Sequence, residues 1–214
     1  MESTTVLLPG GMSLDTDAVI LAGGYSKRAK TFKMELELEG KPVLQHVINV
    51  FLPICTHVIV VGGYQIERLY PLVEAYEEKV SVVYNADYPK GMFTSIKKGI
   101  AEVTGSRFFL TPGDYPLLTL NTCSRLLEYG EQIVKPVYGG RGGHPILMPS
   151  GCIKDILEEE DGSSLRNYLD KQQVIRVITE DEGILYDIDT LTDYEKVRQL
   201  MRRKYQDGSG HRWI

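Results

Sequence analysis

Short apolar runs alternate with amphipathic stretches through the first half of the chain. The runs at residues 17–22, 57–63, 80–84 and 107–111 are rich in Val, Ile, Leu and Phe, and each ends at or is followed by Gly, Asn or Pro. This pattern is typical of buried strands. Residues 34–39 alternate apolar and acidic positions, which predicts a half-exposed strand.

Between these runs, apolar positions recur at helical spacing. One such stripe consists of Val43, Leu44, Val47, Ile48 and Phe51, with Pro42 near the first turn and Pro53 beyond the end. Further helices are predicted at residues 66–76, with an interruption at Pro71, at 91–103 and at 121–129.

The pattern changes after Gly130. Two strands are predicted, at residues 133–138 and 145–148, joined by a glycine-rich loop over 139–143. The remaining expected elements are helices at 152–159 and 163–170, strands at 174–178 and 184–188, and a closing helix that begins after Thr190 and runs to about Tyr205.

Strands that alternate with helices predict an α/β fold with a mainly parallel sheet and helices on both faces. The chain has 214 residues, which suits one domain, here expected over residues 17–205. Residues 1–16 contain Pro, Gly and Ser without periodicity and are expected to form a flexible leader. The polar residues 206–214 are expected to form a loose C-terminal tail.

Composition argues against several classes of protein. The apolar share of 43% is ordinary for a globular protein, and a net charge of -5 without a basic tail argues against nucleic-acid or membrane-surface partners. Cys55, Cys123 and Cys152 lie far apart, which indicates neither a disulfide framework nor a zinc site. The N-terminus lacks the features of a signal peptide and no run is long enough to cross a bilayer, so a cytoplasmic protein is expected.

The stretch DAVILAGGYSKRAKTFK, which ends at Lys33, is the most informative one. Its apolar strand ends at Gly23 and Gly24, and a short loop with Ser26, Lys27, Arg28, Lys30 and Lys33 follows. Glycines let backbone N–H groups approach phosphate oxygens, and the cations neutralise phosphate charge. The stretch matches neither a Walker loop nor GxGxxG, so on the glycine pair alone a solvated surface turn is an equal alternative.

Polar residues also follow the other predicted strands. Asn85 follows the third strand, Asp114 follows the fourth, and Asp187 and Asp189 lie near the end of the last. Because the carboxyl ends of parallel strands meet at one edge of a sheet, cations for a polyphosphate and carboxylates for Mg²⁺ would share one crevice. This combination favours phosphoryl or nucleotidyl transfer, in which positioning and charge neutralisation supply most of the catalysis.

Each of these residues also has a purely structural interpretation. Asn85 and Asp114 are of types that are common in turns. Asp187 and Asp189 are equally consistent with solvated charges at a strand edge. His144 precedes a proline and is more typical of a packed loop histidine than of a catalytic one.

Five blocks, in order along residues 18–194, resemble the MobA-like NTP transferase family, which contains the molybdenum cofactor cytidylyl- and guanylyltransferases. LAGGYSKR with Lys33 resembles the family motif LAxGxSxRMGxxK. The other blocks are Asn85 followed by GMFTSI, which resembles N…GM..S; GDYP, which resembles GDxP; RGGHP, which resembles RGHP with one extra glycine; and DIDTLTDY, which resembles DIDTPEDY.

The resemblance implies a Rossmann-like nucleotidyltransferase fold and a role for each matched residue. Arg28 and Lys33 would hold the triphosphate and stabilise the departing pyrophosphate as catalytic residues. Asp114, also catalytic, would bind Mg²⁺ with Asp189 as the second metal ligand. The nucleotide-binding residues would be Leu21, Ala22, Gly23, Gly24, Ser26, Asn85 and Ser95. An acceptor pocket is expected from residues 139–144 and 163–168, with Arg141, His144 and Arg166 as acceptor-binding residues; of these, Arg166 lies outside the five blocks.

The implied function is Mg²⁺-dependent transfer of a nucleoside monophosphate from an NTP to a phosphorylated acceptor, with release of pyrophosphate. Molybdopterin is the first candidate for the acceptor, and a molybdoenzyme or cofactor-handling protein is a candidate partner. A sugar- or alditol-phosphate nucleotidyltransferase is one alternative. A non-catalytic nucleotide-binding regulatory or chaperone module is another.

Two departures from the family pattern bear on the nucleotide and on activity. Ala29 and Lys30 replace the family's Met-Gly, which removes a flexible glycine and adds a cation. Gly23 follows the guanylyl branch, whereas the blocks around Met92, His144 and Asp187 follow the cytidylyl branch. More blocks favour the cytidylyl branch, so CTP is preferred over GTP.

Overall fold

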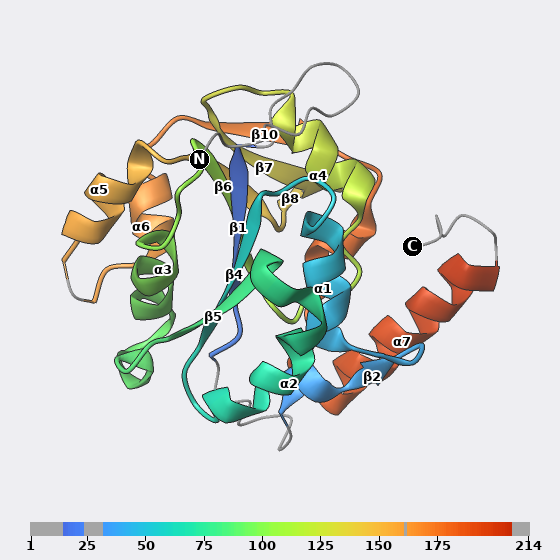
Figure 1. Cartoon of the computed structure of the whole chain (residues 1–214). Helices are drawn as coiled ribbons and strands as arrows, with labels where there is room; N and C mark the ends of the chain where they lie inside the picture. The colour runs from blue at the N-terminus through green and yellow to red at the C-terminus, as the bar shows by residue number, and fades with distance from the viewer. Residues whose placement is uncertain (1–14, 24–31, 161, 207–214) are drawn as a thin grey trace.

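The structure, a computed structural model, describes residues 15–23, 32–160 and 162–206 (Figure 1). An eight-stranded sheet runs through the centre in the order β10-β7-β9-β6-β1-β4-β5, with β8 paired to β7. The strands are β1 (Thr16–Leu21), β4 (His57–Gly62), β5 (Val80–Tyr84), β6 (Arg107–Pro112), β7 (Ile133–Tyr138), β8 (Arg141–Gly142), β9 (Ile146–Pro149) and β10 (Val174–Ile178). A separate hairpin pairs β2 (Glu37–Leu38) with β3 (Lys41–Pro42).

Strand β1 lies in the middle of a parallel group. It pairs with β4 on one side and with β6 on the other, and Leu21 at its end is in register with Val61 and Pro112. Strand β9 is antiparallel to both β6 and β7, while β10 is parallel to β7. The sheet is therefore mixed but mainly parallel, which confirms the predicted fold class.

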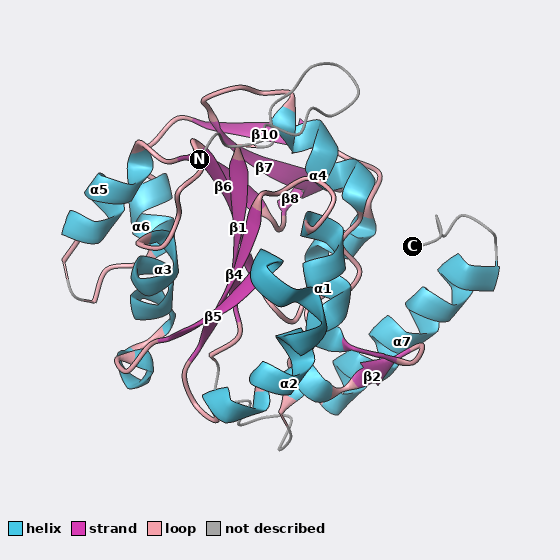
Figure 2. Cartoon of the chain, viewed as in Figure 1, coloured by secondary structure: helices cyan, strands magenta, loops and turns pink. Residues whose placement is uncertain are grey.

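Helices cover both faces of the sheet (Figure 2). One face carries α1 (Val43–Phe51), α2 (Tyr70–Val73) and α4 (Leu120–Leu127), and the other carries α3 (Met92–Ile100), α5 (Cys152–Glu158) and α6 (Leu165–Leu169). The closing helix α7 (Leu191–Gln206) lies beside the β2–β3 hairpin (Figure 1).

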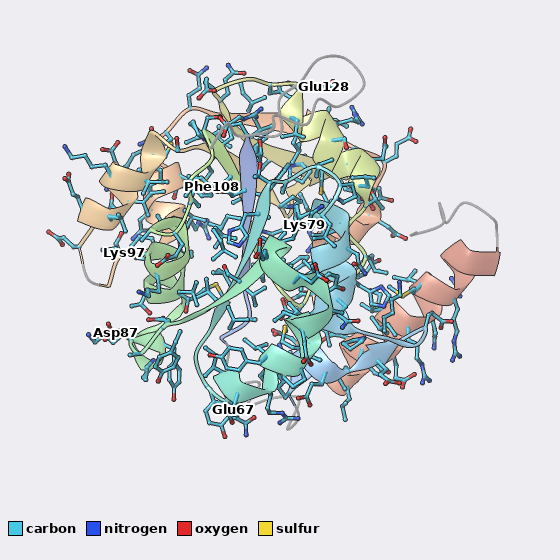
Figure 3. The ribbon with its side chains drawn as sticks, in the orientation of Figure 1. Glu67, Lys79, Asp87, Lys97, Phe108 and Glu128 are labelled. Carbon is cyan, nitrogen blue, oxygen red and sulfur yellow. The ribbon has the colours of Figure 1, made fainter. Side chains whose placement is uncertain are left out.

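Alternation of side chains along β1 explains the two apolar layers. Ala18 and Ile20 point into the core under α1, whereas Val19 and Leu21 point into the core under α3. All four side chains are buried, because helices cover both faces of the sheet. The sequence of the strand is therefore a continuous apolar run. Phe108 on β6 likewise lies inside the molecule, while Glu128 and Lys79 lie at its surface (Figure 3).

Most of the predicted helices and strands are confirmed, and their ends lie within one to three residues of the predicted ones. The stripe on α1 is fully buried, as its spacing predicts. Thr190 caps α7: its Oγ1 accepts a hydrogen bond from the Asp193 backbone N–H at 3.2 Å, and the Asp193 carboxylate accepts from the Thr190 N–H at 2.8 Å. Among the described residues, no helix is long and apolar enough to cross a membrane.

Three predicted elements are wrong in kind. The strand expected at 34–39 is a 3-10 turn, η1 (Lys33–Glu35), followed by the two residues of β2. The helix expected at 66–76 is three short pieces: η2 (Ile66–Arg68), α2 and η3 (Glu74–Lys79). Pro71 cannot donate a hydrogen bond to an earlier turn, so a helix here can only begin beside it.

The third error is the strand expected at 184–188, which is the 3-10 helix η5 (Glu182–Leu185) and an irregular segment. The Asp181 side chain accepts a hydrogen bond from the Gly183 N–H at 3.0 Å and so starts a turn. Ile184 and Ile188 are both fully buried, but in two different clusters. The apolar alternation therefore reflects two core contacts and not a strand. The expected loop at 139–143 also contains a strand, β8.

Close packing of α3 on the sheet depends on Gly99. A Cβ atom at this position would lie 2.5 Å from Val19 Cγ1 and 2.6 Å from Val61 Cγ2, both on buried strands. We expect Gly99→Val to lower the free energy of unfolding by about 2–3 kcal/mol through overpacking. Gly151→Val is the matched control, because a Cβ there meets open space. Urea denaturation of both variants measures the effect, and equal stabilities would contradict this account of the packing.

Candidate active site

Backbone hydrogen bonds extend the central strands at their carboxyl ends. The Ala22 N–H donates to Val61 O at 2.8 Å, and the Gly113 N–H donates to Leu21 O at 2.8 Å. The Asn85 N–H donates to Gly62 O at 2.9 Å. The segments after β1, β4, β5 and β6 are thereby held along one edge of the sheet, the edge at which open α/β sheets bind ligands.

One lysine joins two carboxylates at this edge. Lys33 Nζ lies 2.8 Å from Asp189 Oδ1 and 3.3 Å from Asp114 Oδ2. Lys33 comes from η1, Asp114 follows β6, and Asp189 precedes α7. The Ile188 N–H donates to Asp114 O at 3.1 Å, and this bond fixes the last of these segments beside the loop after β6. The structure therefore brings together all three of these predicted site residues.

Burial and charge act in opposite directions on this triangle. Burial raises the pKa of Asp114, and the neighbouring Lys33 ammonium only partly offsets this effect. Burial would lower the pKa of Lys33, but the hydrogen bond to Asp189 and the two carboxylate charges raise it overall. Lys33 is thus a firmly held cation whose side chain is only 11% exposed.

The pair of carboxylates fits a divalent cation. Both already converge on one positive charge at hydrogen-bond distance, and carboxylate oxygens are the ligands that Mg²⁺ prefers. Within residues 15–23, 32–160 and 162–206, no group of three acidic, His or Cys side chains is placed to hold a metal. A metal on Asp114 and Asp189 would therefore complete its coordination with phosphate oxygens and water, as Mg²⁺ commonly does.

A second group of residues surrounds Asn85, which is buried. Its Nδ2 donates to Thr94 Oγ1 and to Ser95 Oγ, both at 2.9 Å, and its Oδ1 accepts from the Asp87 N–H at 3.0 Å. Both amide hydrogens are thus used to tie the segment after β5 to the start of α3. The loop that contains Asp87 lies at the end of β5 (Figure 3).

Gly23 lies against this group. A Cβ atom on Gly23 would be 3.2 Å from the Gly63 backbone N and 3.6 Å from Ser95 Oγ. Leu21 and Ala22, by contrast, are buried in the core, so only their backbone faces the edge. Gly24, Ser26 and Arg28 lie outside the described residues.

An aromatic pair places one predicted acceptor residue, His144, beside the residue that follows Asp114. The rings of Tyr115 and His144 meet edge to face, with centroids 4.9 Å apart. The pKa of Tyr115 is raised by burial and by the nearby carboxylates, Asp187 first among them, and Arg141 opposes this shift. Arg141 and His144 therefore lie on the same side of the site as Asp114.

Arg166 is placed differently. It lies on α6, which packs on the face of the sheet that α3 and α5 cover. Its side chain is 89% exposed, and its Nε lies 4.0 Å from Asp170 Oδ2, one turn along the same helix. No contact that the structure describes joins it to the other predicted site residues, and its role in acceptor binding stays a prediction.

The sequence matches a known protein family over most of its length. The family model described as the MobA-like NTP transferase domain matches residues 18–177. The chain belongs to this family. It is therefore a member of a family of nucleotidyltransferases, as the five sequence blocks predict.

One relative supports the assignment, and two solved structures share the fold. The chain is 30% identical over 179 residues to the molybdenum cofactor cytidylyltransferase of Escherichia coli K12, covering 83% of this chain and 93% of that protein. A nucleotidyl transferase from Methanothermobacter thermautotroptrophicus has the same fold, with a TM-score of 0.77, 20% identity and coverage of 88% and 98% of the two chains. The protein Rv0371C of Mycobacterium tuberculosis H37Rv, solved in complex with manganese, has a TM-score of 0.71, 19% identity and coverage of 86% and 98%.

Tyr115 is not among the site residues predicted from the sequence. The residue follows Asp114 directly and belongs to the GDYP block, so its position in the sequence was a usable indication. Its contact with His144 arises only from the fold, because β6 and the loop before β9 are adjacent in the sheet.

The buried His144 makes stability depend on pH. Burial lowers its pKa to about 4, with a smaller contribution from Lys135, and its Nδ1 is enclosed without a hydrogen-bond partner. Between about pH 6.5 and pH 4 the unfolded chain binds a proton at this residue and the folded chain does not, so stability falls as the pH falls. We expect a loss of about 2 kcal/mol between pH 7 and pH 5 from this residue.

Urea denaturation of the wild type and of His144→Gln at several pH values measures this contribution. The variant should lose less stability on acidification than the wild type. His46, whose pKa burial also lowers, is retained in both proteins and cancels in the comparison. Equal losses in the two proteins would contradict the assignment.

Proposed function

We propose that this protein transfers CMP from CTP to a phosphorylated acceptor, with molybdopterin as the acceptor and Mg²⁺ as the metal. The single observation that carries the proposal is the Lys33 ammonium held between Asp114 and Asp189 at the edge of the sheet. A buried cation and two convergent carboxylates suit a polyphosphate with its metal.

The chemistry needs no protein nucleophile. A phosphate oxygen of the acceptor attacks the α-phosphorus of CTP, the bond to the bridging oxygen breaks, and pyrophosphate leaves with the negative charge that develops on that oxygen. Lys33 supplies a positive charge where this charge grows, and Arg28 is proposed to act with it. The metal, when bound to Asp114 and Asp189, supplies further charge neutralisation for the phosphate oxygens.

The assignment of the metal rests on chemistry and on the fold. Two carboxylates are too few to hold Mg²⁺ alone, which suits a metal that enters together with the triphosphate. A protein of the same fold has been solved with manganese, which prefers similar oxygen ligands. We propose Mg²⁺ as the physiological ion.

The nucleotide is proposed to bind along the ends of β1, β4 and β5. The backbone of residues 21–24 and Ser26 would face the base and phosphates. Asn85 holds Ser95 in place and is proposed to act together with it on the base or ribose. CTP is preferred because the most similar blocks belong to the cytidylyl branch and because the 30%-identical relative is a cytidylyltransferase.

The acceptor is proposed to lie beside Tyr115, with Arg141 as a partner for its phosphate. His144 is neutral above about pH 4, so it offers no positive charge and would contribute shape or a single hydrogen bond. Arg166 would take part only if the acceptor extends toward α6. The protein partner and the cytoplasmic setting stay predictions.

The metal role of Asp114 can be tested directly. We expect Asp114→Asn to lower turnover of Mg²⁺-CTP with molybdopterin at least a hundredfold, because one of the two carboxylate ligands proposed for the metal is lost. The melting temperature should change little, since Lys33 retains Asp189 as a partner. Unchanged turnover would reject the proposed function. Turnover with a sugar phosphate in place of molybdopterin would instead favour the sugar-phosphate alternative.

The nucleotide preference can be tested with Gly23→Ala. A methyl group there would narrow the space beside Gly63 and Ser95, which should penalise a purine more than a pyrimidine. We expect a larger Mg²⁺-dependent rise in melting temperature with CTP than with GTP in the wild type, and a larger CTP/GTP difference in the variant. A GTP preference in the wild type would reject the cytidylyl assignment, and no shift with any NTP would reject nucleotide binding.

A further inference from the structure

A second ion pair lies next to the Lys33 triangle and uses no predicted site residue. Arg68, at the end of η2, donates from Nε to Glu35 Oε1 at 2.8 Å and from Nη2 to Glu35 Oε2. Its Nη1 donates to Gln65 Oε1 at 3.1 Å, and its guanidinium lies over the Phe32 ring, 4.8 Å from the centroid. Arg68 therefore contacts both ends of residues 32–35. The neighbouring Glu67 marks this place at the lower end of the molecule (Figure 3).

The three consecutive side chains of residues 33–35 each contact a different part of the molecule. Lys33 reaches the two site carboxylates, and Glu35 reaches Arg68. Met34 packs in the core against Gly113: its Sδ lies only 2.9 Å from the place that a Cβ on Gly113 would occupy. A rotation of this turn would therefore move the ammonium group and the packing below Asp114 together.

The turn holds itself only weakly. It is a single 3-10 turn, and its N-cap residue Phe32 makes no side-chain capping bond. Its backbone bonds, from Glu35 N to Phe32 O and from Leu36 N to Lys33 O, are both 3.2 Å long. The Phe32 and Met34 side chains anchor it in the main hydrophobic core, and the two-pronged bond from Arg68 to Glu35 adds a polar contact of defined geometry.

We propose that Arg68 is a positioning residue for the transfer reaction, which acts by clamping Phe32 and Glu35 so that Lys33 Nζ points into the site. This inference rests on the proposed function. The Arg68 and Glu35 side chains are 37% and 34% exposed, and ion pairs this exposed contribute little to stability. The clamp therefore matters through geometry, since small displacements of a charged group cost rate steeply.

Loss of Arg68 would also release a competing charge. Glu35 lies two residues from Lys33, and its carboxylate has Arg68 as its cationic partner. The pKa of Arg68 is raised by its hydrogen bond to Glu35, which agrees with a mutually stabilised pair. Without the guanidinium, the Glu35 carboxylate can draw the turn or the Lys33 ammonium away from the phosphates.

The test compares R68Q, R68K, K33Q and the double variant K33Q/R68Q, with R202Q as the matched control. Arg202 forms an exposed ion pair with Glu39, at 3.1 Å, away from the turn. Two quantities are measured: kcat and KM with Mg²⁺-CTP and molybdopterin, and the affinity for pyrophosphate with Mg²⁺ by calorimetry. Melting temperatures are recorded for all variants.

We expect R68Q to lower kcat and pyrophosphate affinity about tenfold, the size of a weakened charged hydrogen bond, with a change in melting temperature below about 3 °C. R68K should recover only part of the loss, because an ammonium group cannot bridge both carboxylate oxygens. In the K33Q background, R68Q should have no further effect on either quantity. R202Q should match the wild type.

Wild-type values in R68Q would overturn the inference, and so would an equal loss in the K33Q background, which would mean that Arg68 acts independently of Lys33. A wild-type protein that binds pyrophosphate but transfers no nucleotide to molybdopterin would overturn the proposed function instead. The pyrophosphate affinities would then still decide for or against the clamp. A wild-type protein that does not bind pyrophosphate would overturn both.

Discussion

A cation lies between the two carboxylates that face one another at the edge of this sheet. Asp114 and Asp189 would otherwise repel, and Asp187 adds a further negative charge nearby. The positive charge of Lys33 offsets this repulsion, although burial of the ammonium group costs free energy. The raised pKa of Lys33 indicates that the ion pairs more than compensate for this cost. The turn that carries Lys33, the loop after β6 and the segment before α7 are all placed to satisfy this arrangement.

The sheet makes the arrangement possible over long distances in sequence. Lys33 lies 81 residues from Asp114 and 156 residues from Asp189. Strands β1 and β6 are parallel neighbours, so they end at the same edge of the sheet. The segments that follow these two strands therefore begin side by side. The antiparallel strand β9 next to β6 brings the loop with His144 to the same place. Two groups of side chains then share one edge: the charged residues around Lys33, and a small, hydrogen-bonded group around Asn85.

Sequence reasoning succeeded where one local rule dominates. Buried parallel strands need continuous apolar runs, and α1 needs an apolar stripe at helical spacing, so both were predictable. It failed where an apolar pattern had another cause. Ile184 and Ile188 alternate like a strand, but each fills a separate cluster, and the side chain of Asp181 turns the chain between β10 and η5. At residues 66–76, Pro71 and local turns divided what resembled one helix.

The sequence by itself determined the α/β class and the parallel strands of the first half, and it grouped Lys33, Asp114 and Asp189 as candidate residues of one site, although the strand that it predicts before Asp189 is absent. These features depend on residue type, periodicity and motif spacing, all of which are local. Tertiary structure alone decided that Lys33 bridges both carboxylates, that Tyr115 meets His144, and that Arg68 holds Glu35. Such contacts join segments that are far apart in the chain, and their geometry follows from strand order and packing, which no local pattern encodes.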